Sequence, residues 1–421
     1  MKVKVSVRII CGILSLLLAL SAVTACAPAA QSPVAGAVKV KVGLSLGLTG
    51  SLASTVAPIS QGALAYMKWV NDQGGIEYRD PKTGKTEKAL LDIAWEDNAY
   101  SAAKTLSIYK RQKDWGMLLQ VLVMSPDVIA DTASRSQVPI MSVGNITETS
   151  IKPEPRYITV LYGSYLDQML TFVKWTSQQQ ATPPKVGFIL MDLPTHRASG
   201  GGGGLSAELV KEFGGELVGV EWVPAGVTDS SIEMTRLKAG NPDWIYIANV
   251  TSGVSTIAKD AQRLGITPKT RLATITYVFG EDLIPVLGDL SEGLYGALCW
   301  SYPSEATIPG IKLAHDAMQK YYARKASATN VQGVLTSMVA VEGIRQALGK
   351  VGAEALTPSA VNDALHSLTN FDPMGLTKPI TTTTAYPVSS GYVKVGTIKG
   401  GVVQPVSDWI EVSKAMLRFV K

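Results

Sequence analysis

The sequence predicts an α/β protein with two doubly wound parallel-sheet lobes and a cleft between them. Short apolar segments alternate with amphipathic helical segments along almost the whole chain. This alternation favours parallel sheets that are covered by helices on both faces. Several such units lie on either side of a stretch near Thr159–Tyr165. About 395 residues also remain after an N-terminal signal, which is large for a single domain and indicates two.

The first 25 residues have the pattern of a secretory signal peptide. Lys2, Lys4 and Arg8 precede an apolar run from Ile9 to Leu20, and the small residues of "SAVTAC" follow. A basic start, a short apolar core and a small-residue cleavage site are typical of export signals. The apolar run is shorter than the roughly 20 residues of a membrane span, so an uncleaved membrane anchor is the weaker alternative.

The end of this segment, "VTAC", resembles the lipobox of bacterial lipoproteins. The resemblance implies cleavage between Ala25 and Cys26 and acylation of the Cys26 thiol. Residues 26–37 are small, uncharged and contain proline, so they are interpreted as a flexible tether. Acyl chains, at ~0.8 kcal/mol per buried methylene, would hold the protein at a membrane surface.

The alternation begins with the segments that we assign to the first lobe. Apolar runs predict four strands, and the runs between them predict three helices, the first of which ends at Gly74 and Gly75. The charged insert 77–88 is interpreted as a solvated hairpin. In chain order the segments are strand 40–48, helix 58–75, strand 89–97, helix 101–116, strand 117–124, helix 126–137 and strand 138–143.

The same pattern continues in the segments that we assign to the second lobe. Helical and apolar segments alternate again up to Gly265. In open α/β sheets ligands bind beyond the carboxyl ends of the strands, so the loops after the strands are the candidate site. In chain order the segments are helix 172–180, strand 185–192, helix 205–214, strand 216–223, helix 230–240, strand 243–250 and helix 253–265.

Composition excludes several classes of function. Without residues 1–25, 36 Lys and Arg residues face 34 Asp and Glu residues, a net charge of +2. This balance, with no basic stripe among aromatics, argues against nucleic-acid binding. Cys299 lies in an apolar context and is predicted to be a buried core thiol. The three histidines are widely separated and no pair of Cys or His has metal-ligand spacing, so neither a metal nor a cofactor is expected.

The five glycines Gly200–Gly204 lie between a predicted strand and a predicted helix. A glycine-rich turn at this place can cradle phosphate, but a phosphate loop of the P-loop type needs Lys followed by Ser or Thr, which is absent here. We therefore interpret this run as a loop at the rim of the cleft. No G-x-S-x-G or H-E-x-x-H motif is present either, so an enzyme is not indicated.

Four segments in loops and their flanking elements have a distinctive order: "VGLSLGLTGSLASTVAPISQGALAYMKWVNDQGGI", "AWEDNAYSAAKT", "VMSPDVIADTASRSQVPIMSVGNIT" and "DWIYIANVTSGVSTIAKDAQRLGI". Their order resembles the strands and turns of the branched-chain amino-acid (leucine, isoleucine and valine) binding proteins, the type I periplasmic solute-binding family, in its lipoprotein form. The resemblance covers residues 38 to ~370. It implies two lobes joined by a hinge of three crossovers, near 156–160, 298–302 and 368–382. We assign 38–158 plus 300–370 to lobe one and 159–299 plus 371–421 to lobe two.

The resemblance also implies which positions meet the ligand. Ser125 matches the position where a serine and nearby backbone N–H groups receive a carboxylate. The threonine and the acidic residue that hold an α-ammonium group in the family fall at Ile146 and Thr276. Because neither of these can compensate a buried cation, an α-amino acid is less expected than the family name suggests.

Other candidates are amphipathic or aromatic side chains in loops at the predicted cleft. Aromatic rings with one polar tip suit a flat or unsaturated ligand. Tyr162 and Tyr277 could instead pack between the lobes, and Asn249 could cap the next helix. These further candidates are Thr55, Tyr100, Asn145, Tyr162, His196, Asn249 and Tyr277.

The expected function is therefore that of an extracytoplasmic solute-binding lipoprotein. It would bind a small organic solute, either a carboxylate or an amino-acid-like compound, aromatic ones included, by hinge closure. The expected partners are the permease and ATPase subunits of an ABC importer and a bacterial membrane through the lipid anchor, and a monomer is expected. A sensor component of a signalling system is the alternative, and an extracellular enzyme is a weaker one.

Overall fold

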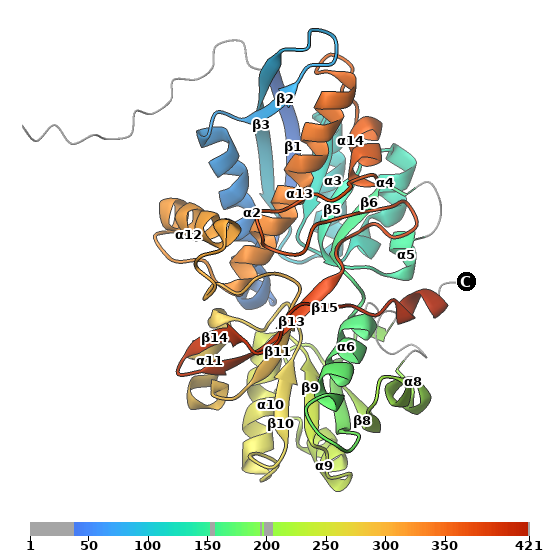
Figure 1. Cartoon of the computed structure of the whole chain (residues 1–421), viewed down its shortest axis with the longest axis vertical. Coiled ribbons are helices and arrows are strands. Elements are labelled where there is room, and N and C mark those ends of the chain that lie inside the picture. Colours follow the sequence, from blue (N-terminus) through green and yellow to red (C-terminus); the bar gives the residue numbers. More distant parts are fainter. Residues whose placement is uncertain (1–37, 152–155, 194–195, 198–204, 420–421) are drawn as a thin grey trace, which may run out of the picture. The chain divides into compact units, whose positions relative to one another are not determined.

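The computed structural model describes residues 38–151, 156–193, 196–197 and 205–419. The predicted signal peptide 1–25, the tether 26–37 with Cys26, and the glycine run 200–204 lie outside the described residues. The described part contains two parallel-rich sheets, as predicted (Figure 1).

The first sheet has seven strands in the order β12-β6-β5-β4-β1-β3-β2. Its neighbouring strands are parallel, apart from β2 and β3, which form the antiparallel hairpin predicted for residues 77–88. The strands are β1 (Val38–Leu46), β2 (Ile76–Arg79), β3 (Thr86–Asp97), β4 (Leu119–Leu122), β5 (Ile140–Asn145), β6 (Ile158–Tyr162) and β12 (Val388–Ser390).

Helices cover this sheet, and the longest two, α2 and α13, pack against each other (Figure 1). Helix α13 also contacts β4 and β5, so residues on its inner side reach the carboxyl ends of the central strands. The helical segments are α2 (Ala53–Asp72), α3 (Ala102–Asp114), η1 (Pro126–Val128), α4 (Ala130–Ser136), α5 (Glu148–Ile151), α12 (Pro309–Tyr322), α13 (Ala328–Val351) and α14 (Pro358–Leu365).

The second sheet has the order β14-β13-β11-β10-β9-β7-β8, and β15 pairs with β13. Strands β7 to β11 are parallel, whereas β13 runs antiparallel to β11 and β14 at one edge. The strands are β7 (Lys185–Met191), β8 (Glu216–Val223), β9 (Trp244–Ala248), β10 (Arg271–Thr274), β11 (Tyr295–Leu298), β13 (Tyr392–Lys399), β14 (Val402–Pro405) and β15 (Ile410–Glu411).

The helices of the second sheet are shorter on average. Helix α6 begins at a serine cap, because Ser164 Oγ accepts a hydrogen bond from the backbone N–H of Asp167 at 3.0 Å. The helical segments are α6 (Tyr165–Ser177), α8 (Ala207–Glu212), α9 (Ser231–Ala239), α10 (Thr251–Arg263), η2 (Glu281–Leu283), α11 (Ile284–Leu287), η3 (Gly288–Ser291) and η4 (Ala415–Phe419).

The chain passes between the sheets three times: from β6 to α6, from β11 to α12, and at Gly391 between β12 and β13. The first two passages lie close to the expected positions, but the third lies later than the expected 368–382. The reason is that β12 pairs with β6, Val388 beside Val160, before the chain leaves the first sheet. The division into lobes stays a prediction, and strand membership adds 159–162 and 388–390 to the first sheet.

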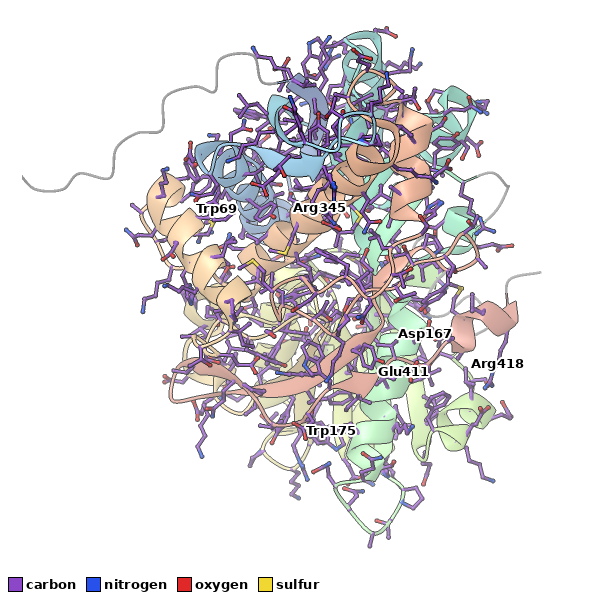
Figure 2. All side chains as sticks on the ribbon, turned by 45° about the horizontal axis from the view of Figure 1, so that its top comes forward. Trp69, Asp167, Trp175, Arg345, Glu411 and Arg418 are labelled. Carbon is purple, nitrogen blue, oxygen red and sulfur yellow. The ribbon has the colours of Figure 1, made fainter. Side chains whose placement is uncertain are left out.

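The interior agrees with the predicted pattern. All residues of β4 and of β9 are buried, as expected for central parallel strands with helices on both faces. Cys299 is fully buried and forms no disulfide, which confirms the predicted core thiol. Asp167 on α6 is buried and accepts hydrogen bonds from Ser413 Oγ at 2.9 Å and from the N–H of Met416 at 3.2 Å, so it holds the C-terminal segment on α6 (Figure 2).

Candidate functional site

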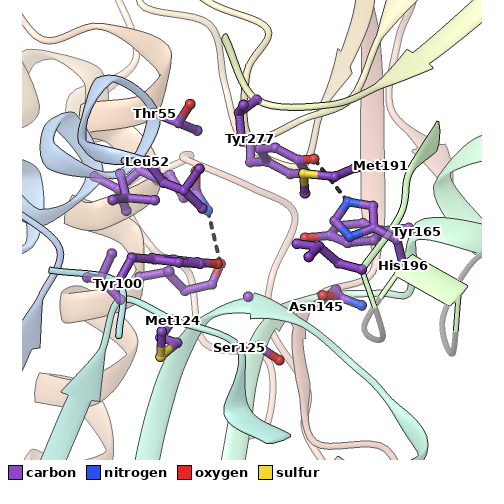
Figure 3. Close-up of a pocket in the computed structure, with 18 of the residues that line it drawn as sticks. Leu52, Thr55, Tyr100, Met124, Ser125, Asn145, Tyr165, Met191, His196 and Tyr277 are labelled. Carbon is purple, nitrogen blue, oxygen red and sulfur yellow. Dashed lines mark hydrogen bonds between the residues drawn. The ribbon is translucent and has the colours of Figure 1, made fainter. Parts of the chain in front are cut away.

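A cavity of about 60 Å³ lies between loops that follow strands of both sheets (Figure 3). Its lining is mostly apolar and aromatic, with a few polar tips, which is the usual composition of a small-molecule site. The lining residues are Leu52, Thr55, Val56, Ile59, Tyr100, Val123, Met124, Ser125, Val143, Gly144, Asn145, Tyr162, Tyr165, Met191, Leu193, His196, Val250, Tyr277 and Gln332.

Seven of the ten predicted ligand-binding residues line this cavity. They come from the first turn of α2, from the loops after β3 and β4, from the ends of β5 and β6, and from the loops after β7 and β10. In both sheets, therefore, the cavity lies beyond the carboxyl ends of the strands, as is usual for ligand sites in open α/β sheets. These residues are Thr55, Tyr100, Ser125, Asn145, Tyr162, His196 and Tyr277.

The loop after β3 is shaped by Asp97, which presents Tyr100 to the cavity. Asp97 accepts hydrogen bonds from the backbone N–H of Leu48 at 2.8 Å and of Ala99 at 3.0 Å, and Ala99 and Tyr100 both have positive φ. Burial of Asp97 acts to raise the pKa of its carboxyl, but the hydrogen bonds outweigh burial and the pKa is lowered. Asp97 therefore shapes the loop as an ionised group.

Ser125 opens the turn after β4, and its hydroxyl is already engaged. Ser125 Oγ donates to Asp127 Oδ2 at 3.0 Å, and Thr147 Oγ1 donates to Asp127 Oδ1 at 2.5 Å. Burial raises the pKa of Asp127, although these hydrogen bonds act in the opposite direction. Towards the cavity, Ser125 in this arrangement offers oxygen lone pairs.

The second sheet contributes a cluster of aromatic rings. His196 Nε2 lies 3.0 Å from the Tyr277 hydroxyl, and the ring of Tyr165 is 4.7 Å from His196 and 5.6 Å from Tyr277 between centroids. Burial lowers the pKa of His196 to about 4 and raises that of Tyr100 to about 12. The imidazole and the phenols are therefore neutral at physiological pH.

One contact in this region joins α2 of the first sheet to α10 of the second. The hydroxyls of Thr55 and Thr251 lie 2.9 Å apart, and the backbone N–H of Thr251 donates to Thr55 Oγ1 at 3.2 Å. Both threonines are at the first turns of their helices and are buried. The contact lies at the edge of the cavity, because Thr55 and Val250 both line it.

Three predicted residues do not line the cavity. Ile146, directly after β5, is fully buried, and Thr276 is buried with its hydroxyl 3.9 Å from Cys299 Sγ. Asn249 accepts hydrogen bonds from the backbone N–H of Gly226 and Val250 and donates to the Pro224 carbonyl, so it orders its own loop. Its side chain makes no cap of α10.

Two of the lining residues with polar side chains, Tyr165 and Gln332, were not predicted from the sequence. Tyr165 is the first residue of α6, three positions after Tyr162, and the serine cap at Ser164 could have revealed it. Gln332 lies inside the buried part of α13 and has no motif around it. A glutamine in an apolar helix looks the same in sequence whether it faces a core or a ligand.

Within the described residues there is no group of three or more His, Cys, Asp or Glu side chains that could hold a metal ion. A search of the described helices for segments long and apolar enough to cross a membrane finds none.

Comparison with known proteins was made for sequence and for structure. The family model of the periplasmic binding proteins matches residues 39–399. No curated protein matches the chain.

Several solved structures share the fold. A branched-chain amino-acid ABC transporter protein from Thermus thermophilus with bound valine has a TM-score of 0.78 at 23% identity, covering 91% of this chain and 99% of that one. Leucine-binding protein LivK from Thermotoga maritima has 0.70 at 17%, covering 89% and 99%. A fatty-acid ABC transporter substrate-binding protein from Thermomonospora curvata has 0.72 at 19%, covering 90% and 94%.

Proposed function

The chain belongs to the periplasmic binding protein family, and we propose on this basis that it is the extracytoplasmic solute-binding subunit of an ABC importer. Its task would be to bind a small organic solute between the loops of its two sheets. The permease and ATPase subunits of the importer would then recognise the solute-bound form. We expect the protein to act as a monomer.

The observation that supports this proposal best is the cavity itself. Its walls come from strand-following loops of both sheets, and a hydrogen bond between Thr55 and Thr251 joins the two sides at its edge. A solute that contacts both walls favours the arrangement in which the walls are close, which is the thermodynamic content of hinge closure. We propose that the seven lining residues predicted from the sequence contact the solute.

The solute is a small organic compound of a class that the fold leaves open. The three similar structures are named as a branched-chain amino-acid transporter with bound valine, a leucine-binding protein and a fatty-acid transporter, so one fold serves ligands with different head groups. The candidates for this chain are carboxylates and amino-acid-like compounds, aromatic ones included.

Thermal unfolding of residues 38–421 in the presence of candidate solutes tests the proposal. A solute at 100 times its dissociation constant should stabilise the protein by about 2.7 kcal/mol. The panel comprises branched-chain amino acids, aromatic carboxylates, small amides and short dicarboxylates, and each bound compound is recovered and checked for chemical change. A protein that binds none of these compounds, or that converts one of them, would contradict the importer role.

We further propose that Cys26 carries a lipid that anchors the protein to a bacterial membrane, in the periplasm or at the outer cell surface. The support is the lipobox-like "VTAC" after an apolar core. In cells, Cys26→Ala should accumulate as a larger, unacylated precursor, because the Cys26 thiol must be acylated before the signal peptide is cleaved. A Cys26→Ala protein of normal mature mass that stays with the membrane would overturn the anchor.

A further inference from the structure

The described lining of the cavity carries no formal charge at neutral pH. Among the described residues, no Asp, Glu, Lys or Arg side chain lines it. His196 is the remaining ionisable group that could be cationic, and burial lowers its pKa to about 4. A charged group that enters this cavity loses its water and gains no counter-ion from the lining.

One wall of the cavity contains side chains that carry hydrogen-bond acceptors. Gln332 is 1% exposed, and its Nε2 donates to the carbonyl of Val143 at 3.0 Å. A carbonyl oxygen can only accept a hydrogen bond, so the Gln332 atom that faces it must be the amide nitrogen. This fixes the orientation of the Gln332 amide. Gln332 Oε1 is buried and has no hydrogen-bond partner among the described residues. A buried acceptor without a partner costs free energy until a donor reaches it.

Two neighbouring side chains add to this wall. Asn145 lines the cavity, and its Nδ2 uses one N–H to donate to the carbonyl of Ile146 at 3.1 Å, while its Oδ1 is an acceptor. Ser125 Oγ donates to Asp127 and likewise presents lone pairs. Figure 3 shows Ser125 and Asn145 on the side of the cavity opposite Tyr277. A solute with N–H donors is complementary to such a wall, and a carboxylate, which only accepts, is not.

The rest of the lining defines the remainder of the solute. Leu52, Val56 and Ile59 supply apolar contacts from the start of α2, and Tyr100 and Tyr165 also line the space. These groups favour an apolar or aromatic body of small size. The pair of His196 and Tyr277 contains one N–H and one O–H group, one of which donates to the other.

We propose that the cavity selects a solute with an uncharged primary carboxamide head group on a small apolar or aromatic body, and that the amide donates an N–H to Gln332 Oε1. This inference rests on the proposed solute-binding function, but it replaces the carboxylate and amino-acid candidates with a different ligand class. An α-amino acid is disfavoured, because its ammonium and carboxylate would both be desolvated without a counter-charge.

The test compares head groups on constant bodies, by isothermal titration calorimetry of residues 38–421. One series is isobutyramide, isobutyrate, isobutylamine and valine; the other is phenylacetamide, phenylacetate, 2-phenylethylamine and phenylalanine. We expect an amide to bind at least about 10-fold more tightly than the other members of its series, which corresponds to ~1.4 kcal/mol. Tighter binding of a carboxylate, an amine or an amino acid overturns the inference.

Gln332→Met keeps the length of the side chain and removes the acceptor, so amide affinity should fall about 10-fold. Gln120→Met is the matched control. Gln120 is also a buried glutamine whose Oε1 has no partner, but it does not line the cavity, and amide affinity should be unchanged. Equal losses in the two variants would overturn the assignment of Gln332.

Gln332→Glu is the second variant, and it is informative even where Gln332→Met folds poorly. It places a carboxyl where the described lining lacks an anion, so amines should gain affinity relative to the amide. If no member of either series binds, the protein is not a binding protein for these compounds, and the inference fails as well. Binding of phenylacetate or valine in preference to the amide would leave the solute-binding function intact and overturn only the head group.

Discussion

The imidazole of His196 shows how a single residue keeps the cavity uncharged. His196 is 4% exposed, its ring packs against Tyr165, and its Nε2 lies beside the Tyr277 hydroxyl. None of these neighbours is an anion that would favour the imidazolium form, so burial dominates and lowers the pKa to about 4. The same histidine in water would be partly protonated near pH 6.5.

This shift predicts a pH dependence of stability. Between pH 6.5 and about 4 the unfolded chain binds a proton at His196 and the folded chain does not, so stability falls as pH falls through this window. The loss from this residue should reach ~3 kcal/mol near pH 4. Urea unfolding at pH 7.0 and 4.5 should show a smaller drop for His196→Gln than for the wild-type chain.

Other buried groups titrate in the same pH range. Their contributions to stability are the same in the wild-type chain and in His196→Gln, so they cancel in the comparison. Burial raises the pKa of Glu281 to about 7, so this carboxyl contributes stability at low pH that is lost as pH rises, the opposite sign to His196. Glu281 is unchanged in His196→Gln. Parallel pH profiles of the two proteins would show that His196 is already protonated or solvated in the fold.

At the level of elements, the close approach of α2 and α13 positions Gln332 in the wall of the cavity. A methyl group on Gly62 would lie 2.1 Å from the Asn330 carbonyl oxygen, and one on Gly333 would lie 2.0 Å from that of Ile59. Asn330 Nδ2 also donates to the Pro58 carbonyl at 2.6 Å. Because Gln332 precedes Gly333, the depth of α13 against α2 sets where Gln332 Oε1 lies.

Gly333→Ala should therefore be destabilising, by about 1–3 kcal/mol, since the added methyl forces the two backbones apart. Gly349→Ala in the same helix is the control: an added methyl there lies 3.9 Å from its nearest neighbour, and the better helix propensity of alanine should stabilise by up to ~1 kcal/mol. Urea unfolding measures both. Destabilisation of the same size in both variants would mean that helix contact is not the cause.

The elements were largely predictable from the sequence, and the site only in part. Alternating apolar and amphipathic runs indicate parallel sheets, and the rule that ligands lie beyond strand ends leads to loop residues such as Tyr100, Ser125 and Asn145. Gln332 was beyond this reasoning, because it reaches the cavity from the middle of a helix through a contact between α2 and α13. The sequence of residues 377–403 predicts extended strands at the edge of the second lobe, where β13 and β14 lie, but the pairing of β12 with β6, more than 200 positions earlier, was not predicted because β12 is only three residues long.

For the whole molecule, the size of the cavity is the central quantity. A cavity of about 60 Å³ is well below the ~150 Å³ that accommodates benzene in a protein core. A solute with even a small apolar body therefore needs the two sides to move apart before it can enter or leave. The hydrogen bond between Thr55 and Thr251 belongs to the close arrangement and should break in the open one.

A disulfide between positions 55 and 251 should hold the two sides of the cavity together and so prevent the solute from binding. The two hydroxyl oxygens are 2.9 Å apart, which places the two side chains within reach of a disulfide in Thr55→Cys combined with Thr251→Cys. In residues 38–421 the only native cysteine is Cys299, which is fully buried and should not compete. After oxidation, calorimetry should detect no binding of a solute that binds the wild-type chain, and reduction should restore it.

The single variant Thr251→Cys, oxidised in the same way, controls for the loss of the threonine hydroxyl and should still bind. The disulfide variant distinguishes solute entry with movement of the two sides from solute entry without it. If the double variant forms its disulfide and binds with unchanged affinity, the solute reaches the cavity without movement of the two sides, and hinge closure is not its mechanism. If binding depends on reduction, the close arrangement described by Thr55 and Thr251 is the state that closes around the solute, and transport must include its opening.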